Sequence, residues 1–332
     1  MTRNAVIRGT GHYAPPTILT NADFERMVDT SDAWIVERTG IRERHVLNGS
    51  GDFGNSDMAV AAARQALDDA GLGPGDLDAI VIATVTPDYQ LPSTATIVQR
   101  KLGAGRATVF DIVAACAGFI YGLSIARAFV VSGTHKCVLV VGTEYLTSIT
   151  NYKDRNTCVL FGDGAGAAIV TPSRPGEEER GILATYLSGN GRYQELLHIP
   201  LGGSRRPLTA ETVNDTGRFI YMDGREVFKL AVREMADAAE RVMAEASLTS
   251  REIDLLIPHQ ANIRIIEAVG KRLNIDPEHV YVNIERYGNT SSASVPIALD
   301  EARRVGRLRP GSTVLSVAFG GGLTWGAALF RL

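Results

Sequence analysis

Cys116 is the first residue of this chain whose setting suggests chemistry. It lies where a β-branched run gives way to an apolar helical pattern, in the segment Phe110-Asp111-Ile112-Val113-Ala114-Ala115-Cys116-Ala117-Gly118-Phe119. A cysteine at a strand-to-helix turn holds its sulfur at the positive end of a helix dipole, which stabilises the nucleophilic thiolate. A small buried core cysteine fits this segment equally well. The choice between the two depends on residues elsewhere in the chain.

Three segments of the second half of the chain are candidates to face this cysteine. A strand-like run ends at Pro258, and His259 follows at the edge where open α/β sheets bind ligands. Gly288 and Asn289 form a turn before a helix of small residues, so the Asn289 amide can face an oxyanion. The glycines at 320–322 offer free backbone N–H groups, as an oxyanion hole requires. A structural histidine, an N-cap asparagine and a plain β-turn are the competing interpretations.

The elements that must position these residues occur twice. The run at 76–82 resembles that at 252–257, and the run at 137–142 resembles that at 313–318. Asp78 and Asp254 differ by 176 positions, as do Val138 and Val314. With the same offset Cys116 corresponds to position 292, at the start of a predicted helix. We infer two copies of one α/β unit, whose equivalent turns meet near a pseudo-two-fold axis and form a ligand site there.

Each copy alternates strand-like runs with helices of 3.6-residue period, which is typical of sheets covered by helices. Amphipathic helices are predicted over 56–70, 225–246 and 291–305. Strands are predicted near 4–9, 79–84, 108–113, 138–142 and 165–170 in the first copy, and near 182–188, 255–258, 281–283, 313–318 and 326–330 in the second. The polar stretch 171–180 predicts a short linker, so the chain divides into tightly packed halves, 1–172 and 180–332.

Composition argues against several classes of function. The 332 residues are 45% hydrophobic with a formal net charge of −3, so no positive excess exists to bind nucleic acid or a membrane surface. Three widely spaced cysteines form neither a disulfide framework nor a metal-binding pair, and Cys137 and Cys158 are expected in the core. Residues 1–9 lack a signal-peptide core, and no run approaches a membrane span. A cytoplasmic protein with no membrane partner is expected.

Five motifs, in order along the chain, resemble those of β-ketoacyl-acyl-carrier-protein synthase III, a condensing-enzyme family of the thiolase superfamily. They are Ala115-Cys116-Ala117-Gly118, Phe161-Gly162-Asp163-Gly164-Ala165-Gly166, Pro258-His259-Gln260-Ala261-Asn262, Gly288-Asn289-Thr290-Ser291 and Phe319-Gly320-Gly321-Gly322-Leu323-Thr324-Trp325-Gly326. The similarity covers essentially the whole chain. It implies a thiolase-like α/β fold of duplicated βαβαβαββ halves that form a five-layered αβαβα core. Elongating synthases carry a second histidine at the place of Asn289, and thiolases a second cysteine.

The resemblance implies a decarboxylative Claisen condensation of an acetyl-CoA or short branched acyl-CoA primer with malonyl-acyl carrier protein. Cys116 would accept the acyl group, and the N–H groups of Cys116 and Gly321 would hold the tetrahedral oxyanion. His259 and Asn289 would donate hydrogen bonds to the enolate formed by loss of CO₂, which requires a neutral His259. The products would be β-ketoacyl-acyl carrier protein, CO₂ and CoA, at the start of fatty acid synthesis. No metal or cofactor is implied.

A coenzyme site is also implied by the resemblance. Trp34 would stack on the adenine of CoA with Arg155 on its other side, while Arg38 and Arg264 would meet phosphates. Trp34 and Arg38 stand one helical turn apart. An amphipathic tryptophan with a neighbouring arginine is the alternative.

Carrier docking and subunit pairing follow from the same resemblance. Arg264, Lys271 and Arg272 would form the basic helix that docks the acidic acyl carrier protein. Such charges more often lie on a helix face that is simply exposed to solvent. Leu91 would cap the acyl pocket of the neighbouring subunit in a homodimer. Family members often have phenylalanine there, so the size of the primer stays open.

Two other functions share these residues. One is a secondary-metabolite acyltransferase or ketosynthase, of polyketide or quinolone type, with the same Cys-His-Asn triad. The other is a non-condensing binder or cysteine hydrolase. The identity of the carrier protein and the pathway are not determined by the sequence.

Overall fold

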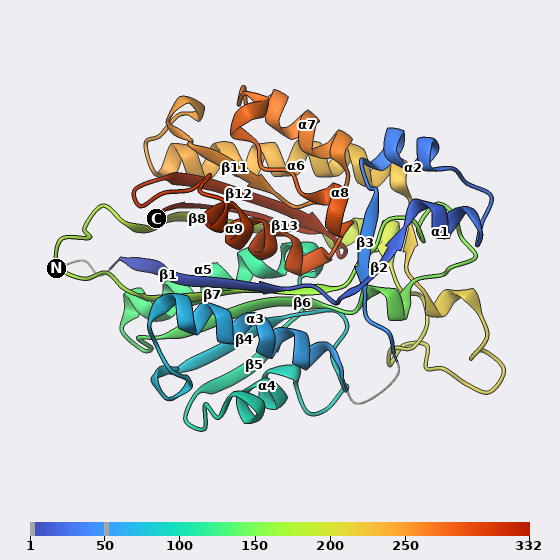
Figure 1. Ribbon diagram of the computed structural model, residues 1–332, viewed down its shortest axis with the longest axis horizontal. Helices are drawn as coiled ribbons and strands as arrows, with labels where there is room; N and C mark the ends of the chain where they lie inside the picture. The colour runs from blue at the N-terminus through green and yellow to red at the C-terminus, as the bar shows by residue number, and fades with distance from the viewer. Residues whose placement is uncertain (1–3, 50–52) are drawn as a thin grey trace.

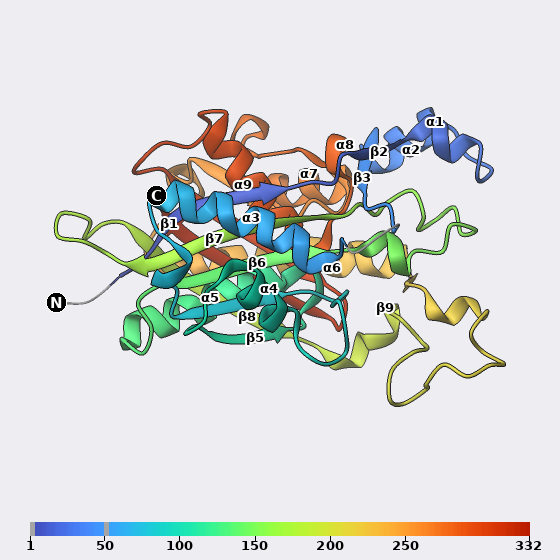
Figure 2. The same ribbon diagram turned by 60° about the horizontal axis from the view of Figure 1, so that its bottom comes forward.

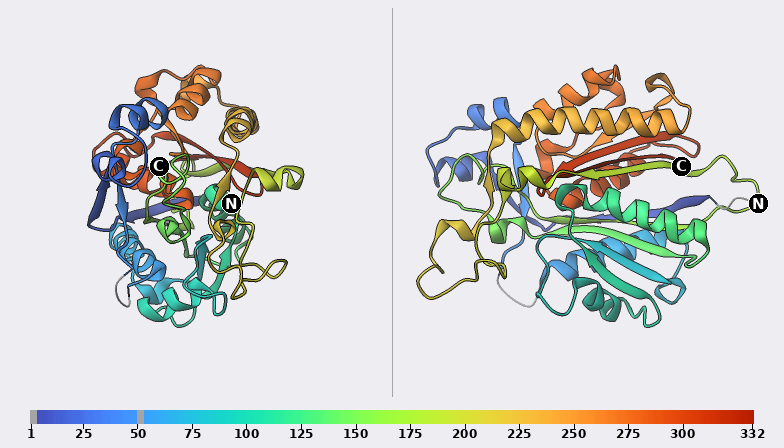
Figure 3. Two further views of the ribbon diagram at one scale, coloured as in Figure 1. Left: turned by 90° about the vertical axis from the view of Figure 1, so that its right-hand side faces the viewer. Right: turned by 180° about the vertical axis from the view of Figure 1, so that it is seen from behind.

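Three helical layers alternate with two sheets in this protein. The structure is a computed structural model in which residues 4–49 and 53–332 are described. From top to bottom in Figure 1, the helical layers are α6 (Gly224–Glu245) with α7 (Ile263–Arg272), α5 (Gly118–Ser132) with α9 (Ser294–Arg304), and α3 (Asn55–Ala70) with α4 (Thr94–Leu102). The right-hand view of Figure 3 shows the same stack from behind. The predicted five-layered αβαβα core is confirmed.

The two sheets are built alike. The first has the strand order β1-β7-β6-β4-β5 and the second β11-β12-β13-β8. The first sheet contains β1 (Ala5–Tyr13), β4 (Ala79–Ala83), β5 (Thr108–Ile112), β6 (Val138–Glu144) and β7 (Gly164–Pro172). The second contains β8 (Gly181–Gly189), β11 (Leu255–Pro258), β12 (Thr313–Gly320) and β13 (Thr324–Arg331). Nine of the ten predicted strands are therefore present among the described residues, with small shifts at their ends.

The predicted repeat holds at the level of strand register. Ala79 of β4 pairs with Val138 of β6, and Leu255 of β11 pairs with Val314 of β12, in both cases in parallel. The two pairs are related by the same offset of 176 positions that the sequence showed. The two halves therefore share their central strand pairing.

An aspartate anchors this strand pair in each half. The Asp78 carboxylate accepts the N–H of Cys137 at 3.1 Å, and the Asp254 carboxylate accepts the N–H of Thr313 at 2.7 Å. Asp78 and Asp254 also donate their own N–H groups to the carbonyls of Cys137 and Thr313. The aspartates that revealed the repeat thus fix the start of the central strands.

The equivalent turns meet at the centre of the molecule. They are the short 3₁₀ helices η2 (Ala115–Ala117) and η8 (Ser291–Ala293), and they pack against each other. Each also packs against the central strand of the opposite half, η8 on β6 and η2 on β12. Ala115 and Ser291 have φ angles of 44° and 49°, a region that residues with a side chain rarely adopt. The duplication therefore places two strained turns side by side.

The predicted strand at 281–283 is wrong. Val280 forms only an isolated bridge to β11, and the segment after it is not a strand. Instead, the Gln260 side chain donates to the Tyr281 carbonyl at 3.1 Å and accepts the Asn283 N–H at 3.0 Å. Because one amide side chain satisfies these backbone groups, the second sheet lacks a counterpart of β5.

The remaining elements extend from the end of the stack that lies opposite the two termini (Figures 1 and 2). They are β2 (Thr17–Thr20), α1 (Asn21–Glu25), α2 (Asp32–Thr39), β3 (Glu43–Val46), β9 (Leu197–His198), β10 (Tyr221–Met222) and α8 (Ile284–Tyr287). Further short 3₁₀ helices are η1 (Pro74–Asp76), η3 (Leu146–Ile149), η4 (Gly191–Leu196), η5 (Thr216–Arg218), η6 (Ser250–Glu252) and η7 (Pro277–His279). Residues 173–180 connect β7 to β8, and the division into halves 1–172 and 180–332 stays a prediction, with residues 1–3 and 50–52 of the first half outside the described residues.

The stretch Ala115–Ser132 has the length and composition of a membrane-spanning helix. Most of it is α5, which packs against strands of both sheets in the middle layer. Its apolar character is therefore that of a core helix. Cys137 and Cys158 are buried, as predicted.

Candidate active site

A cleft of about 1330 Å³ is lined by residues from both halves of the chain. Cys116, His259 and Asn289 all line it, and so does Gly321. The thiol comes from the first half, and the imidazole and the carboxamide come from the second. The structure thus brings together three side chains that the sequence separates by up to 173 positions.

Cys116 stands just before the N-terminus of α5, and only 9% of the residue is exposed. Burial raises the pKa of its thiol to about 12, and the charge of Glu144 acts in the same direction, while a hydrogen bond with the Ser291 side chain opposes them. Desolvation therefore favours the neutral thiol in the resting protein and opposes the thiolate that the helix dipole would stabilise. A proton must leave the sulfur before it attacks.

His259 follows β11 directly and is 2% exposed. Burial lowers the pKa of its imidazole to about 3, so the ring is neutral at physiological pH. Nδ1 lies 2.6 Å from Ser294 Oγ, and the same oxygen accepts the N–H of Gln260 at 3.4 Å. A Ser294 hydroxyl that donates to Nδ1 places the ring hydrogen on Nε2. A neutral His259 ring with its hydrogen on Nε2 can donate a hydrogen bond from that atom.

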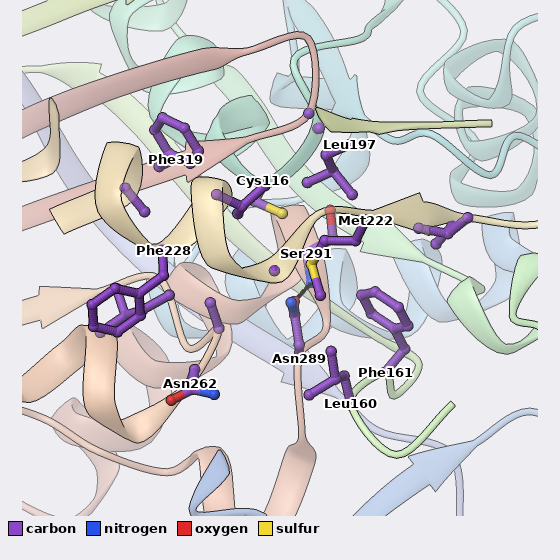
Figure 4. A pocket seen from close by; sticks show the side chains of 18 of the residues that line it. Cys116, Leu160, Phe161, Leu197, Met222, Phe228, Asn262, Asn289, Ser291 and Phe319 are labelled. Carbon is purple, nitrogen blue, oxygen red and sulfur yellow. Dashed lines mark hydrogen bonds between the residues drawn. The ribbon is translucent and has the colours of Figure 1, made fainter. Parts of the chain in front are cut away.

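The side-chain oxygen of Asn289 fixes the orientation of its amide group. Oδ1 accepts the N–H of Ser291 at 2.8 Å, so the amide nitrogen is the end of the side chain that remains for a ligand. The backbone of Asn289 pairs with the segment around Phe161, through its N–H to the Leu160 carbonyl and its carbonyl to the Gly162 N–H. The N-cap of η8 is Thr290, so Asn289 is not the N-cap residue of the competing interpretation, and its side chain instead holds the turn before η8 through its oxygen. Figure 4 shows Asn289, Ser291 and Cys116 together in the cleft.

Gly320, the last residue of β12, approaches Cys116 more closely than any side chain would allow. A Cβ on Gly320 would lie 2.5 Å from the backbone nitrogen of Cys116. Gly321 follows in the wall of the cleft. The loop thus brings two backbone N–H groups, those of Cys116 and Gly321, to one region of the cleft.

Trp34 and two arginines form one cluster at the cleft. The guanidinium carbons of Arg38 and Arg155 lie 4.8 Å and 5.1 Å from the centre of the Trp34 ring. Trp34, Arg38 and Arg264 line the cleft, and Arg155 adjoins it through Trp34. The four residues predicted for coenzyme binding are thus placed around one cleft.

Comparison with known proteins identifies the family. Two family models match: 3-Oxoacyl-[acyl-carrier-protein (ACP)] synthase III over residues 110–191, and its C-terminal model over residues 243–332. The beta-ketoacyl-[acyl-carrier-protein] synthase III of Caldanaerobacter subterraneus subsp. tengcongensis is 54% identical over 327 residues, which cover 98% of this chain and 97% of that relative. The chain belongs to the β-ketoacyl-acyl-carrier-protein synthase III family. The predicted enzyme class, an acyltransferase of the condensing type, is confirmed with it.

Solved structures of the synthase III family have the same fold. The 3-oxoacyl-[acyl-carrier-protein] synthase III from Aquifex aeolicus VF5 is 48% identical, with a TM-score of 0.91 over 99% of this chain and 100% of that one. The priming beta-ketosynthase from the R1128 polyketide biosynthetic pathway is 38% identical, with a TM-score of 0.90 over 99% of this chain and 97% of that one. The thiolase-like fold is therefore confirmed.

Besides Arg155, three residues predicted from the synthase III resemblance do not line the cleft. Lys271 and Arg272 are exposed at the end of α7, where Arg272 donates to Asp237 of α6 at 2.7 Å. Leu91 is 87% exposed between β4 and α4. Its place against a neighbouring subunit stays a prediction.

Several residues of the site were missed in the sequence. Arg225 and Lys229, one turn apart at the start of α6, line the cleft and add positive charge to it. Their spacing of four residues on a predicted amphipathic helix could have indicated a shared basic face. The apolar wall was missed because its members come from four separate segments; it includes Leu160, Phe161, Leu197, Met222 and Phe228. Among the residues that the structure describes, no group of three or more His, Cys, Asp or Glu side chains is arranged to hold a metal ion.

Proposed function

We propose that this cleft condenses a short acyl-CoA primer with malonyl-acyl carrier protein and releases β-ketoacyl-acyl carrier protein, CO₂ and CoA, the reaction that initiates fatty acid synthesis. The observation that carries the proposal is the shared cleft of Cys116, His259 and Asn289 beside two backbone donors. A relative 54% identical over nearly the whole chain is named for this synthase, whereas the polyketide-pathway relative is 38% identical. This difference favours fatty acid initiation over secondary metabolism.

In the first half-reaction Cys116 takes the acyl group. Its thiol loses a proton, the sulfur attacks the thioester carbon of acyl-CoA, and the carbon–sulfur bond to CoA breaks. Negative charge develops on the carbonyl oxygen, where the N–H groups of Cys116 and Gly321 stabilise it. Gly320 contributes by lacking a side chain, since a Cβ there would push the two donors apart.

In the second half-reaction His259 and Asn289 act as donors. The malonyl carbon–carbon bond breaks, CO₂ leaves, and the electron pair forms an enolate on the carrier-bound thioester. His259 Nε2–H and the Asn289 amide stabilise the enolate oxygen, and a neutral His259 does so without giving up its proton. The enolate carbon then attacks the acyl carbon, and the electron pair of the broken carbon–sulfur bond returns to Cys116.

Substrate binding follows from the charges around the entrance. Trp34 and Arg155 would hold the adenine of CoA, and Arg38 and Arg264 its phosphates. The carrier protein would dock on Arg264, Lys271 and Arg272. No cofactor takes part in these steps, with acyl-CoA and malonyl-acyl carrier protein as substrates.

A homodimer formed through the first half is part of the proposal, as is a cytoplasmic location. β5 is the edge strand of the first sheet, and an edge strand exposes unpaired backbone groups. Val113, directly after β5, is 78% exposed although it lines the cleft beside Cys116, and Leu91 is 87% exposed. A second subunit on this edge would cover both and close the acyl pocket.

The test separates the two half-reactions. With labelled acetyl-CoA, Cys116→Ser should lose both acyl label and condensation, whereas His259→Ala and Asn289→Ala should keep the label and lose condensation by about 10²–10³-fold, as expected for one lost oxyanion donor. Cys137→Ser, a buried cysteine outside the cleft, is the matched control. A fully active Cys116→Ser enzyme would refute the proposal. Comparing acetyl-, isobutyryl- and octanoyl-CoA as primers defines the acyl pocket.

A further inference from the structure

A fully buried arginine without a role in the steps above lies behind the wall of the cleft. Arg44 is on β3, and none of the residue is exposed. Burial lowers the pKa of its guanidinium to about 10, although the charges of Asp23 and Glu43 oppose this, so the group stays charged at physiological pH. Burying a charge is costly, and an apolar residue of similar volume often packs equally well. The contacts of Arg44 indicate what the cation does there.

The Arg44 guanidinium is held by neutral acceptors. Nη1 donates to Asn21 Oδ1 at 2.8 Å and lies 3.5 Å from the Leu19 carbonyl, and Nη2 donates to the Val159 carbonyl. The guanidinium carbon lies 4.5 Å from the centre of the Phe24 ring. In the part of the chain that the structure describes, no carboxylate lies within hydrogen-bonding distance of the guanidinium. The group therefore holds backbone and amide oxygens together and does not serve a counter-ion.

The aliphatic stem of Arg44 lies against two glycines next to Asn289. A Cβ on Gly162 would lie 3.1 Å from the Arg44 Cβ, and a Cβ on Gly288 would lie 3.2 Å from it. Gly288 directly precedes Asn289 and has a φ angle of 63°, which favours glycine. The Arg44 side chain thus fills the space beneath the turn that presents Asn289 to the cleft.

Asn289 is bound on both sides by the segment 159–162, which forms part of the cleft wall. Its N–H donates to the Leu160 carbonyl at 2.8 Å, and its carbonyl accepts the Gly162 N–H at 3.0 Å. Arg44 holds this segment by the carbonyl of the residue just before Leu160. Figure 4 shows Leu160 next to Asn289. A displacement of the segment would therefore displace Asn289 with it.

The strand that carries Arg44 is anchored to the same surroundings by its backbone. Just before β3, the Arg42 N–H donates to the Glu285 carbonyl of α8 at 3.0 Å, and within β3 the His45 carbonyl accepts the Asp163 N–H at 2.8 Å. Figure 1 shows β3 beside α8. These backbone contacts do not involve the Arg44 side chain, so replacing that side chain tests the guanidinium and not the strand.

We propose that Arg44 is a positioning residue for Asn289: its guanidinium holds the segment 159–162 where that segment fixes the Asn289 backbone and keeps the amide nitrogen directed at the enolate. This role rests on the proposed function. A misplacement of about 1 Å at a reacting group can cost about 10²-fold in rate. The effect belongs to condensation, because the acylation donors, Cys116 and Gly321, lie on η2 and after β12.

The test measures the two half-reactions separately in the full chain with Arg44→Met, which keeps an extended side chain and removes its charge and donors. Single-turnover transfer of labelled acetyl groups from saturating acetyl-CoA to Cys116 should proceed at the wild-type rate. Condensation of the acylated enzyme with malonyl-acyl carrier protein should slow by about 10²-fold. Arg127→Met is the matched control, since Arg127 also donates to two backbone carbonyls, those of Ile182 and Leu183, but does not line the cleft. It should leave both half-reactions unchanged.

A double-mutant cycle shows whether Arg44 acts through Asn289. Asn289→Ala alone should slow condensation by about 10²–10³-fold, and adding Arg44→Met should slow it little further, because the effects of coupled residues do not add. Losses that multiply would overturn the positioning role. So would a wild-type condensation rate in Arg44→Met, or an equal loss of both half-reactions, which marks a merely structural role. Wild-type condensation by Asn289→Ala would refute the proposed function of Asn289 and the positioning role with it.

Arg44→Lys takes the place of Arg44→Met in the cycle if the methionine variant does not fold. It keeps the charge but replaces the rigid fork, which reaches Asn21 and Val159 at once, by a single ammonium group. It should slow condensation less than Asn289→Ala does, and the double variant should again equal Asn289→Ala alone. A wild-type rate in Arg44→Lys, or a multiplied loss in the double variant, would overturn the role.

Discussion

Replacement of Gly320 by alanine should disable the oxyanion hole without replacing any catalytic side chain. A Cβ at Gly320 would lie 2.5 Å from the Cys116 nitrogen and 3.0 Å from the Ala115 Cβ. Since Cβ contacts below 3.0 Å are essentially never seen, the end of β12 and η2 must separate by roughly half an ångström. Oxyanion donors act within about 2.7–3.1 Å, so one of the two donors is lost, which costs about 10²–10³-fold in rate, or about 2.7–4 kcal/mol.

The assay is single-turnover transfer of labelled acetyl groups from CoA to Cys116. Gly320→Ala should slow this transfer by about 10²–10³-fold, whereas alkylation by iodoacetamide should change little, because it creates no oxyanion. Thermal unfolding should show a loss of about 1–3 kcal/mol from overpacking. Gly203→Ala is the matched control, since a Cβ there meets nothing within 4 Å. Acyl transfer by Gly320→Ala at the wild-type rate would contradict the assignment of these backbone donors.

Three further predictions concern the entrance, the histidine and the missing strand. Trp34→Ala should raise the KM for acetyl-CoA by about tenfold with little change in kcat, since a base stacked on an aromatic ring contributes about 1–3 kcal/mol; an unchanged KM would remove Trp34 from the coenzyme site. Because the pKa of His259 falls from its usual 6.5 to about 3 on folding, folding stability should decline as pH drops below about 6.5, by up to about 1.4 kcal/mol per pH unit. Urea titrations of His259→Asn should show a flatter decline, and an identical slope would argue against a buried neutral imidazole. Gln260→Met should lower the free energy of unfolding by about 2–4 kcal/mol, because it leaves buried backbone groups of Tyr281 and Asn283 unpaired; an unchanged thermal midpoint would contradict this account of the missing strand.

The strands and the repeat were predictable because they depend on local pattern. Apolar runs of β-branched residues and the offset between Asp78 and Asp254 survive in the sequence whatever the packing. The failure at 281–283 has a different origin. There a β-rich run is present, but the Gln260 side chain takes the hydrogen bonds that a neighbouring strand would make. A side chain that takes over the hydrogen bonds of a strand can be recognised only once the positions of residues distant in sequence are known.

The ionisation state of Cys116 could not be predicted from its segment. The helix dipole is a property of the segment itself, but the opposing desolvation comes from the segments that enclose the sulfur. For the same reason Glu144, Ser291 and Ser294 were not selected as neighbours of the site. Their hydrogen bonds reach across 147 positions for Glu144 to Ser291 and 35 positions for His259 to Ser294.

The sequence by itself determined the family, the duplicated α/β halves and the identity of the thiol, imidazole and carboxamide, because these follow from periodicity and from motifs that are contiguous in the chain. Tertiary structure decided how those groups are protonated and which end of each faces the cleft. It also decided that Glu144 lies within hydrogen-bonding reach of the serine beside Cys116. The physical reason is that desolvation and hydrogen-bond pairing are set by neighbours in space, and here those neighbours come from opposite halves of the molecule.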